Sequence, residues 1–280
     1  MAKQFEGKVV LITGSSNGIG RGIAVHFAAR GAKVTLTGRS EEALAETKAE
    51  CVAAGASESD ILSIAGNLTE EPFMSKLVND AVAHFGKLDV LVNNAGVTDK
   101  EMSGKQPGVL TQGLDSYDYI FQINVRCVVY LCREATPHLE KTKGAIVNIS
   151  SIVASDIQSA NFPYYAMSKS ALDSLTKSLA LELIRKGIRV NGVKPGAVTS
   201  KIMERQGATR EVMHQVETAL SSRFDMIPVG FFGKPEDIAH ITGFLSDSVQ
   251  SRYIIGQSIR VDGGSSLVCP LLLGDVLEKK

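Results

Sequence analysis

Short apolar runs alternate along the chain with segments whose apolar residues recur at helical spacing. The apolar runs are 9–13, 33–37, 61–65, 88–94, 144–150, 188–193 and 258–264, and the helical segments are 18–30, 41–54, about 70–85, about 115–140 and one that includes 164–172. Continuous rather than alternating apolar runs are typical of strands buried on both faces. The repeated strand-then-helix order therefore predicts an α/β fold: a Rossmann-like, doubly wound parallel β-sheet with helices on both faces.

No linker-like stretch interrupts this rhythm, so residues 1–280 are expected to form a single domain. Two segments, Thr98–Leu114 and Lys201–Gly233, depart from the pattern and follow strands on the side where open α/β sheets bind ligands. We expect a substrate-loop region over about 199–233. The C-terminal tail, 265–280, is apolar and then charged. Two roles remain open for it: cover over a groove or a neighbouring subunit, or packing on the protein's own surface.

Composition narrows the classes of partner. The chain carries 30 basic and 30 acidic residues, and this zero net charge argues against nucleic acid or an anionic membrane as the main partner. Its four cysteines form no CxxC pair and no zinc-type cluster with histidine, so we expect no metal site and reduced thiols. With no signal-like leader and no membrane-spanning apolar run, the expected location is the cytoplasm.

Residues 13–20, TGSSNGIG, follow a predicted strand and open a predicted helix, the context that a phosphate-binding turn requires. Gly14 would allow a tight turn, while Gly18 and Gly20 would let a pyrophosphate approach the backbone and the helix pack on the sheet. The helix N-terminus offers free N–H groups and a positive dipole end. Glycine-rich turns also serve packing alone. The candidate nucleotide contacts here are Gly14, Ser16, Asn17, Gly18, Ile19 and Gly20.

The end of the second predicted strand, LTGRS, bears on the choice of nucleotide. An acidic residue at this place would bind the adenosine ribose diol, and an arginine would accommodate a 2′-phosphate. No Asp or Glu lies between Lys33 and Ser40, and Arg39 occupies the expected place. A guanidinium can pair bidentately with phosphate, so the sequence predicts NADP(H) rather than NAD(H).

The stretch YYAMSKSAL, residues 164–172, contains two adjacent tyrosines and a lysine. Residues four apart share a helical face, which pairs Tyr165 with Lys169 and Tyr164 with Ser168. A tyrosine pKa is ordinarily about 10, and a nearby ammonium lowers the cost of the phenolate. Tyr165 and Lys169 therefore suit proton exchange with a carbonyl or alcohol oxygen, although this spacing is also common in exposed surface pairs. Tyr164 is expected to pack beside the pocket.

Six motifs follow one another in order: TGSSNGIG, VLVNNAG (90–96), FQINV containing Asn124, NISS (148–151), YYAMSK and VKPGAVTS (193–200). Together they closely resemble the short-chain dehydrogenase/reductase family, from Gly7 to Gly264. The resemblance implies a small-molecule substrate and a homo-oligomer, a tetramer or a dimer.

The resemblance also implies a role for each matching residue. Tyr165 matches the catalytic acid/base, and Lys169 the residue that lowers the tyrosine pKa and binds the nicotinamide ribose. Ser151 matches the residue that polarises the substrate oxygen, and Asn124 the one that holds a relay water. The remaining cofactor positions implied are Asn67 and Leu68 near the adenine, Asn94, Ala95 and Gly96 beside the adenosine ribose, and Pro195, Gly196, Val198 and Thr199 near the nicotinamide.

Three positions depart from the commonest family pattern. Asn17 stands where many NADP-dependent relatives carry a basic residue, so recognition of a 2′-phosphate would depend on Arg39 and Ser40. Asn67 stands where an aspartate is frequent. Ser151 and Tyr165 are 14 positions apart, one more than usual, which leaves Ser150 as a competitor for the role of Ser151.

The expected substrate wall is mostly apolar and consists of Ile152, Val153, Phe162, Pro163 and Met203. This wall predicts a small, moderately apolar substrate. The family resemblance and Arg39 then imply an NADP(H)-dependent enzyme that transfers hydride between nicotinamide and the carbonyl or secondary alcohol of that substrate. Two alternatives remain open on the same fold: an epimerase or dehydratase, and a non-catalytic NADP(H)-sensing protein.

Overall fold

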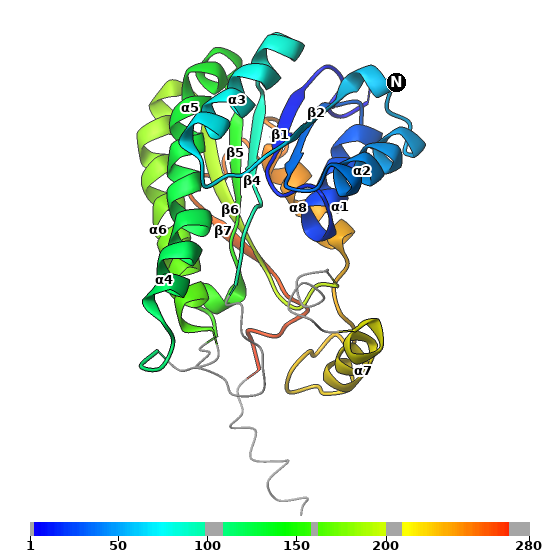
Figure 1. Cartoon of the computed structure of the whole chain (residues 1–280), viewed down its shortest axis with the longest axis vertical. Coiled ribbons are helices and arrows are strands. Elements are labelled where there is room, and N and C mark those ends of the chain that lie inside the picture. Colours follow the sequence, from blue (N-terminus) through cyan, green and yellow to red (C-terminus); the bar gives the residue numbers. More distant parts are fainter. Residues whose placement is uncertain (1–2, 99–108, 158–161, 200–208, 269–280) are drawn as a thin grey trace, which may run out of the picture.

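Seven parallel strands form one sheet in the computed structural model, which describes residues 3–98, 109–157, 162–199 and 209–268 (Figure 1). The strands are β1 (Val9–Ile12), β2 (Lys33–Gly38), β3 (Ile61–Ala65), β4 (Val90–Asn93), β5 (Ala145–Ile149), β6 (Arg189–Pro195) and β7 (Ser258–Val261). Their order is β3-β2-β1-β4-β5-β6-β7, and every neighbouring pair is parallel. The order reverses direction between β1 and β4, so the predicted doubly wound sheet is confirmed.

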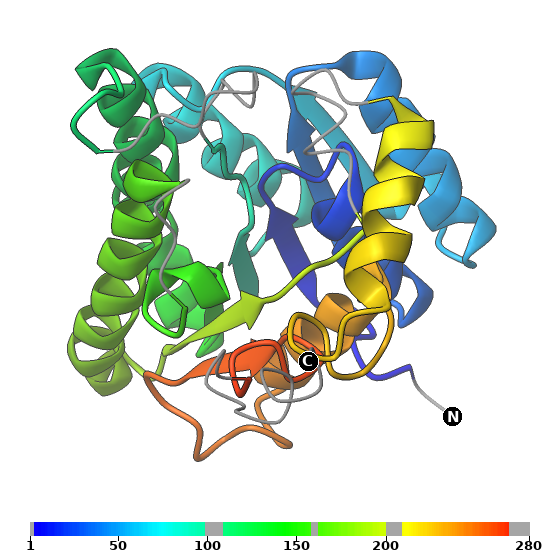
Figure 2. The same ribbon diagram turned by 90° about the horizontal axis from the view of Figure 1, so that it is seen from below.

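Helices cover both faces of this sheet, as the view along the strand ends shows (Figure 2). One face carries α1 (Gly18–Ala29), α2 (Glu41–Ala53) and α8 (Pro235–Ser246), and the other carries α3 (Glu71–Phe85), α4 (Leu114–Phe121), α5 (Cys127–Thr142) and α6 (Pro163–Leu183). Three 3-10 turns, η1 (Glu58–Asp60), η3 (Ile152–Ala154) and η4 (Ile184–Lys186), lie in the connections.

The continuous apolar strands follow from this two-sided cover. Val10 and Ile12 of β1 pack into the cluster that contains α1, α2 and α8, while Val9 and Leu11 pack into the cluster of α3, α5 and α6. All four side chains are fully buried. Because successive strand residues point to opposite faces, a strand covered on both sides must be apolar at every position.

The structure departs from the sequence-based elements at two places. The helix expected over about 115–140 is α4 and α5, joined by a π-helical turn, η2 (Gln122–Arg126), that no sequence pattern indicated. Helix α8 was missed altogether. Its N-terminus carries ordinary start signals, Pro235 at the first position and Glu236 and Asp237 in the first turn.

The predicted substrate-loop region emerges at the carboxyl ends of the strands. Val198 pairs with Gly233 in an isolated parallel bridge, with Thr199 N–H donating to Gly233 O at 2.9 Å and Gly233 N–H to Ala197 O at 3.0 Å. The segment therefore begins and ends at one narrow neck, and its helix α7 (Arg210–Ser221) lies beyond the strand ends (Figure 1). Residues 200–208, with Met203, and 269–280, most of the tail, lie outside the described residues.

Candidate active site

The glycine turn between β1 and α1 is shaped by two close backbone approaches. Gly14 adopts a φ of +65°, and a Cβ there would lie 2.9 Å from Ala95 Cα. A Cβ on Gly20 would lie 2.3 Å from Gly14 O and 2.4 Å from the Asn94 amide nitrogen. Only glycine fits either position. Asn17, at the N-cap of α1, makes no side-chain cap, so the first N–H groups of the helix remain available to an anion.

Thr13 and Asn94 hold this turn against the end of β4. The Thr13 hydroxyl accepts N–H bonds from Asn94 and Ala95, both at 3.0 Å. The Asn94 side-chain amide donates to Thr13 O at 2.9 Å and Gly14 O at 3.1 Å. Asn94 thus braces the nucleotide turn with its amide nitrogen. Thr13 was missed from sequence; the available signal was a polar residue at the end of an otherwise apolar run.

Arg39 lies just beyond β2, beside the glycine turn. A Cβ on the preceding Gly38 would lie 3.0 Å from Ser16 Oγ, which shows how close the two loops run. Arg39 is exposed and makes no hydrogen bond or ion pair with any residue that the structure describes. By contrast, Arg21 is held by ion pairs with Glu46 and Glu50, both at 2.8 Å. Arg39 is therefore the cation free to meet an anion here.

Ser40 and Asn67 are engaged in local turns. Ser40 caps α2 by accepting the Ala43 N–H at 3.2 Å, and it donates to a Glu42 carboxylate oxygen at 2.8 Å. Asn67 Oδ1 accepts the Thr69 N–H at 3.1 Å in the loop before α3. These local contacts use part of the hydrogen-bonding capacity of both side chains.

Tyr165, near the start of α6, lies close to the side chain of Ser151, which follows β5. Burial raises the pKa of the Tyr165 phenol above its ordinary value, while the nearby Ser151 hydroxyl acts in the opposite direction. Ser150 instead donates to the main-chain oxygen of Lys169 at 3.3 Å and is buried. The geometry thus pairs Ser151, and not Ser150, with the tyrosine.

Lys169 lies one helical turn after Tyr165, as its spacing predicted. Its ammonium nitrogen is 5.6 Å from the Tyr165 ring centroid and donates to Ile149 O at 2.8 Å. Burial lowers the pKa of Lys169 to about 8, and the charge of Asp173 offsets part of this shift. Burial holds the pKa of Tyr165 above its ordinary value, so the phenol is protonated at neutral pH, the form that a proton donor requires.

Asn124 is fully buried within the π-helical turn. Its amide donates to Val97 O at 2.8 Å and to Ser168 Oγ at 3.0 Å, and its oxygen accepts the Val97 N–H at 2.9 Å. A Cβ on Gly96 would lie 3.3 Å from Lys169 Nζ and 3.5 Å from Asn124 Oδ1, so these three residues meet at one point. Single π-helical turns occur frequently at functional sites.

Tyr164 packs away from Lys169 and is buried. Its hydroxyl donates to Gln112 O at 3.1 Å, and its ring meets Tyr117 edge-on with centroids 5.4 Å apart. It thereby ties the segment before α4 to the start of α6, which fits the packing role expected from sequence.

The segment expected from the sequence to lie near a nicotinamide leaves β6 at Pro195. Gly196 N–H donates to Val261 O at 3.0 Å, and a Cβ on Gly196 would lie 2.7 Å from Asp262 Cα. Val198 and Thr199 form the neck with Gly233. Of the expected substrate wall, Ile152 and Pro163 are buried, and Val153 and Phe162 are partly exposed.

A model described as enoyl-(acyl carrier protein) reductase matches residues 14–266 of the chain. The chain belongs to the short-chain dehydrogenase/reductase family. It is 33% identical to 3beta-hydroxysteroid dehydrogenase 1 of Eggerthella lenta, over 95% of this chain and 97% of that protein.

Two solved structures from Caenorhabditis elegans are also similar. A short-chain dehydrogenase/reductase of unknown function, solved with cofactor, has a TM-score of 0.92 and 43% identity over 95% of this chain and 98% of that one. A glucose dehydrogenase in the apo form has a TM-score of 0.79 and 42% identity, covering 94% and 99% of the respective chains. The resemblance inferred from sequence is thus confirmed at the level of the family and its oxidoreductase chemistry on alcohol and carbonyl groups.

The described residues contain no candidate metal site: nowhere among them do three or more histidine, cysteine, aspartate or glutamate side chains gather so that they could hold a metal ion. Nor does any helix there have the length and apolar character needed to cross a membrane. Cys51, Cys127 and Cys132 are free and buried, while Cys269 lies outside the described ranges.

Proposed function

We propose that the chain is an NADP(H)-dependent oxidoreductase that acts on the carbonyl or secondary alcohol of a small, moderately apolar substrate, with Tyr165 as the acid/base. The observation that carries this proposal is the placement of Tyr165 close to the Ser151 hydroxyl, with the buried Lys169 ammonium 5.6 Å from the phenol ring. A protonated phenol and a hydroxyl side by side can both donate hydrogen bonds to one oxygen atom.

In the reducing direction, Ser151 and Tyr165 would hold the substrate carbonyl oxygen and stabilise the negative charge that develops on it. Tyr165 would deliver its proton to that oxygen, and the Lys169 ammonium would stabilise the phenolate left behind. Asn124 would fix the backbone of Val97 and face Lys169, the position from which a relay water could be held. In the oxidising direction the phenolate would accept the alcohol proton.

The nucleotide would supply hydride transfer when bound. The cradle formed by Gly14 and Gly20, with the uncapped start of α1, fits a pyrophosphate because a Cβ at either glycine would collide with the backbone. The free Arg39 side chain supports NADP(H) over NAD(H). Ser16, Gly18, Ile19, Leu68, Ala95, Gly96, Pro195, Gly196, Val198 and Thr199 complete the proposed contacts. A homo-oligomer is also part of this proposal, supported by the exposed apolar Leu181 and Ile184 at the end of the long α6 helix and its 3-10 extension.

Stoichiometric consumption of NADPH with a panel of carbonyl compounds tests the proposal directly. We expect one alcohol formed per NADPH oxidised, with apolar ketones and aldehydes preferred over highly charged ones. NADPH binding without turnover on any substrate would instead indicate a sensing protein. Product formation without net NADPH loss would indicate an epimerase or a dehydratase.

The pKa of Lys169 predicts how carbonyl reduction depends on pH. Lys169 loses its proton as the pH rises through about 8, because burial lowers its pKa. The phenolate formed by proton transfer then loses its stabilising charge, so kcat for reduction should fall above that pH. A pH–rate profile at saturating substrate measures this fall in kcat at alkaline pH. The fall should be absent in Lys169→Met. If kcat of Lys169→Met fell at the same pH as kcat of the wild-type protein, Lys169 would be excluded as the group that causes the decrease.

A further inference from the structure

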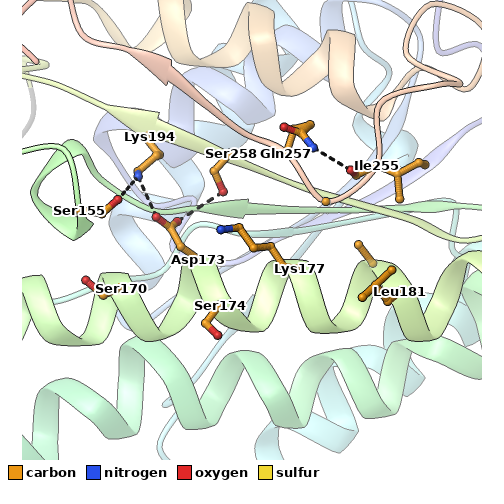
Figure 3. Close-up of a pocket in the computed structure, with 12 residues that line it drawn as sticks. Ser155, Ser170, Asp173, Ser174, Lys177, Leu181, Lys194, Ile255, Gln257 and Ser258 are labelled. Atoms are coloured by element: carbon orange, nitrogen blue, oxygen red, sulfur yellow. Dashed lines mark hydrogen bonds and ion pairs between the residues drawn. The ribbon is translucent and has the colours of Figure 1, made fainter. Parts of the chain in front are cut away.

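A compact cluster of charges lies behind the candidate active site, at the edge of an open hollow of about 630 Å³ between α6, β6 and β7 (Figure 3). At its centre is Lys194, whose side chain is only 6% exposed. Its ammonium nitrogen lies 2.6 Å from Asp156 Oδ2 and 2.9 Å from Asp173 Oδ2, and it donates to Ser155 Oγ at 2.8 Å. Lys194 thus contacts three side chains from two other segments.

Each of these segments also carries a candidate site residue. Ser155 and Asp156 follow the short turn that begins at Ser151, and Asp156 N–H donates to Ile152 O at 3.0 Å within that turn. Asp173 lies on α6, one turn beyond Lys169 and two turns beyond Tyr165. Lys194 itself immediately precedes Pro195, where the predicted nicotinamide loop begins. One lysine therefore joins the segment of Ser151, the helix of Tyr165 and the end of β6.

Strand β7 completes the cluster. Ser258 donates to Asp173 Oδ1 at 3.4 Å, and Arg260 lies 3.5 Å from Asp156 Oδ1. Two cations thus balance two carboxylates. Burial acts to lower the pKa of Lys194, but the contacts of its ammonium with the carboxylates of Asp156 and Asp173 outweigh burial and raise that pKa, so the ammonium is charged at neutral pH.

Stability alone does not explain such an arrangement. Removing charges from water is costly, and well-packed apolar residues often stabilise a protein as well as a buried ion pair does. What charge-assisted hydrogen bonds add is direction, because each fixes the position of one atom relative to another. Here the hydrogen bond from Lys194 to Ser155, together with the ion pairs of Lys194 with Asp156 and Asp173, fixes the chain just after Ser151 relative to the helix that carries Tyr165.

We propose that Lys194 is a positioning residue that sets the place of the Ser151 segment relative to Tyr165 and Lys169. This inference rests on the proposed oxidoreductase function, because its consequence is the alignment of the two groups that would bind the substrate oxygen. A displacement of about 1 Å at such a site can cost about a hundredfold in rate.

The test compares three variants. Among the described residues, Lys194→Met leaves Asp173 without a cation and Asp156 with Arg260 alone, and it can unfold the protein. The deciding variant is therefore Lys194→Met/Asp156→Asn/Asp173→Asn, which removes both carboxylates together with the lysine and leaves only the solvent-exposed Arg260 charged. Lys177→Met is the control, because Lys177 lines the same hollow without contacting the cluster (Figure 3). In the triple variant we expect kcat to fall by about 10- to 100-fold while KM and the Kd for NADPH change by less than about threefold. The control should retain the kcat of the unaltered protein.

Amide hydrogen exchange provides a readout that needs no turnover. Amides of residues 151–157 should exchange at least about tenfold faster in the triple variant, with those of β1 unchanged. If the unaltered protein reduces no carbonyl compound, the proposed function fails and the exchange experiment still decides the positioning role. Wild-type exchange over 151–157 in a folded triple variant, or kcat within about twofold of wild type, would overturn the inference.

Discussion

Replacing Tyr165 by phenylalanine is expected to lower kcat for carbonyl reduction by about a thousandfold, within the range that general acid catalysis contributes. The change removes one hydroxyl that lies close to Ser151 and leaves the ring beside Lys169 in place. The adjacent phenol of Tyr164 could not take over the proton transfer, because Tyr164 directs its hydroxyl to Gln112 O. Steady-state kinetics with a ketone identified by the NADPH assay measure the effect.

A measurement of NADPH binding shows whether Tyr165→Phe has lost only the proton transfer or has also lost the folded nucleotide site. The Kd of NADPH for Tyr165→Phe should stay within about threefold of the wild-type value, because the glycine turn and Arg39 are untouched and a single neutral hydrogen bond contributes little. Tyr164→Phe is the matched control: it removes a neighbouring hydroxyl, should cost about 1 kcal/mol of stability and should keep kcat within a small factor. Full activity in Tyr165→Phe, or an equal loss in Tyr164→Phe, would contradict the assignment.

The second large effect concerns the nucleotide. Replacing Arg39 by alanine should weaken NADPH binding by about 10- to 100-fold, which corresponds to the loss of a charge-assisted hydrogen bond to a phosphate. NADH binding should be nearly unchanged, because NADH carries no 2′-phosphate. Arg39 is free of partners among the described residues, so its removal breaks no internal contact. Titrations of both nucleotides against both proteins measure the difference.

Arg252→Ala provides the charge-matched control for this experiment. Arg252 is also exposed, but it precedes β7, at the opposite edge of the sheet from β2. It should leave the Kd of both nucleotides unaltered. Raising the salt concentration should weaken NADPH binding to the wild-type protein more than to Arg39→Ala, since screening acts on exposed charges. Tighter binding of NADH than of NADPH by the wild-type protein would refute the choice of cofactor.

The strands and most helices could be predicted because local patterning determines them. A run such as VVLI in β1 is apolar at every position only if both faces are covered, so both the strand and its two-sided burial were readable. The π-helical turn at Asn124 was not readable, because its residues have ordinary helical character. There Asn124 bonds to Val97 and Ser168, contacts that exist only once the chain has folded.

The candidate site was predictable where its residues share one helix or one turn. The spacing of Tyr165 and Lys169 placed them on one face, and TGSSNGIG indicated the cradle. The cluster around Lys194 could not be found this way, since Lys194, Asp156 and Asp173 are far apart in sequence and each resembles an ordinary surface charge. The raised pKa of Tyr165 was also missed, because burial depends on tertiary packing.

The neck at Val198 and Gly233 bears on how enzymes of this design diversify. A segment that leaves and re-enters the framework at adjacent residues can be lengthened, shortened or exchanged with little entropic penalty, because the cost of closing a loop grows only slowly with its length. Tyr165 and Lys169, the residues proposed to transfer the proton, lie outside that segment, on α6. Selectivity for a new substrate could therefore evolve by replacing the segment between Val198 and Gly233, while the rest of the fold stays intact.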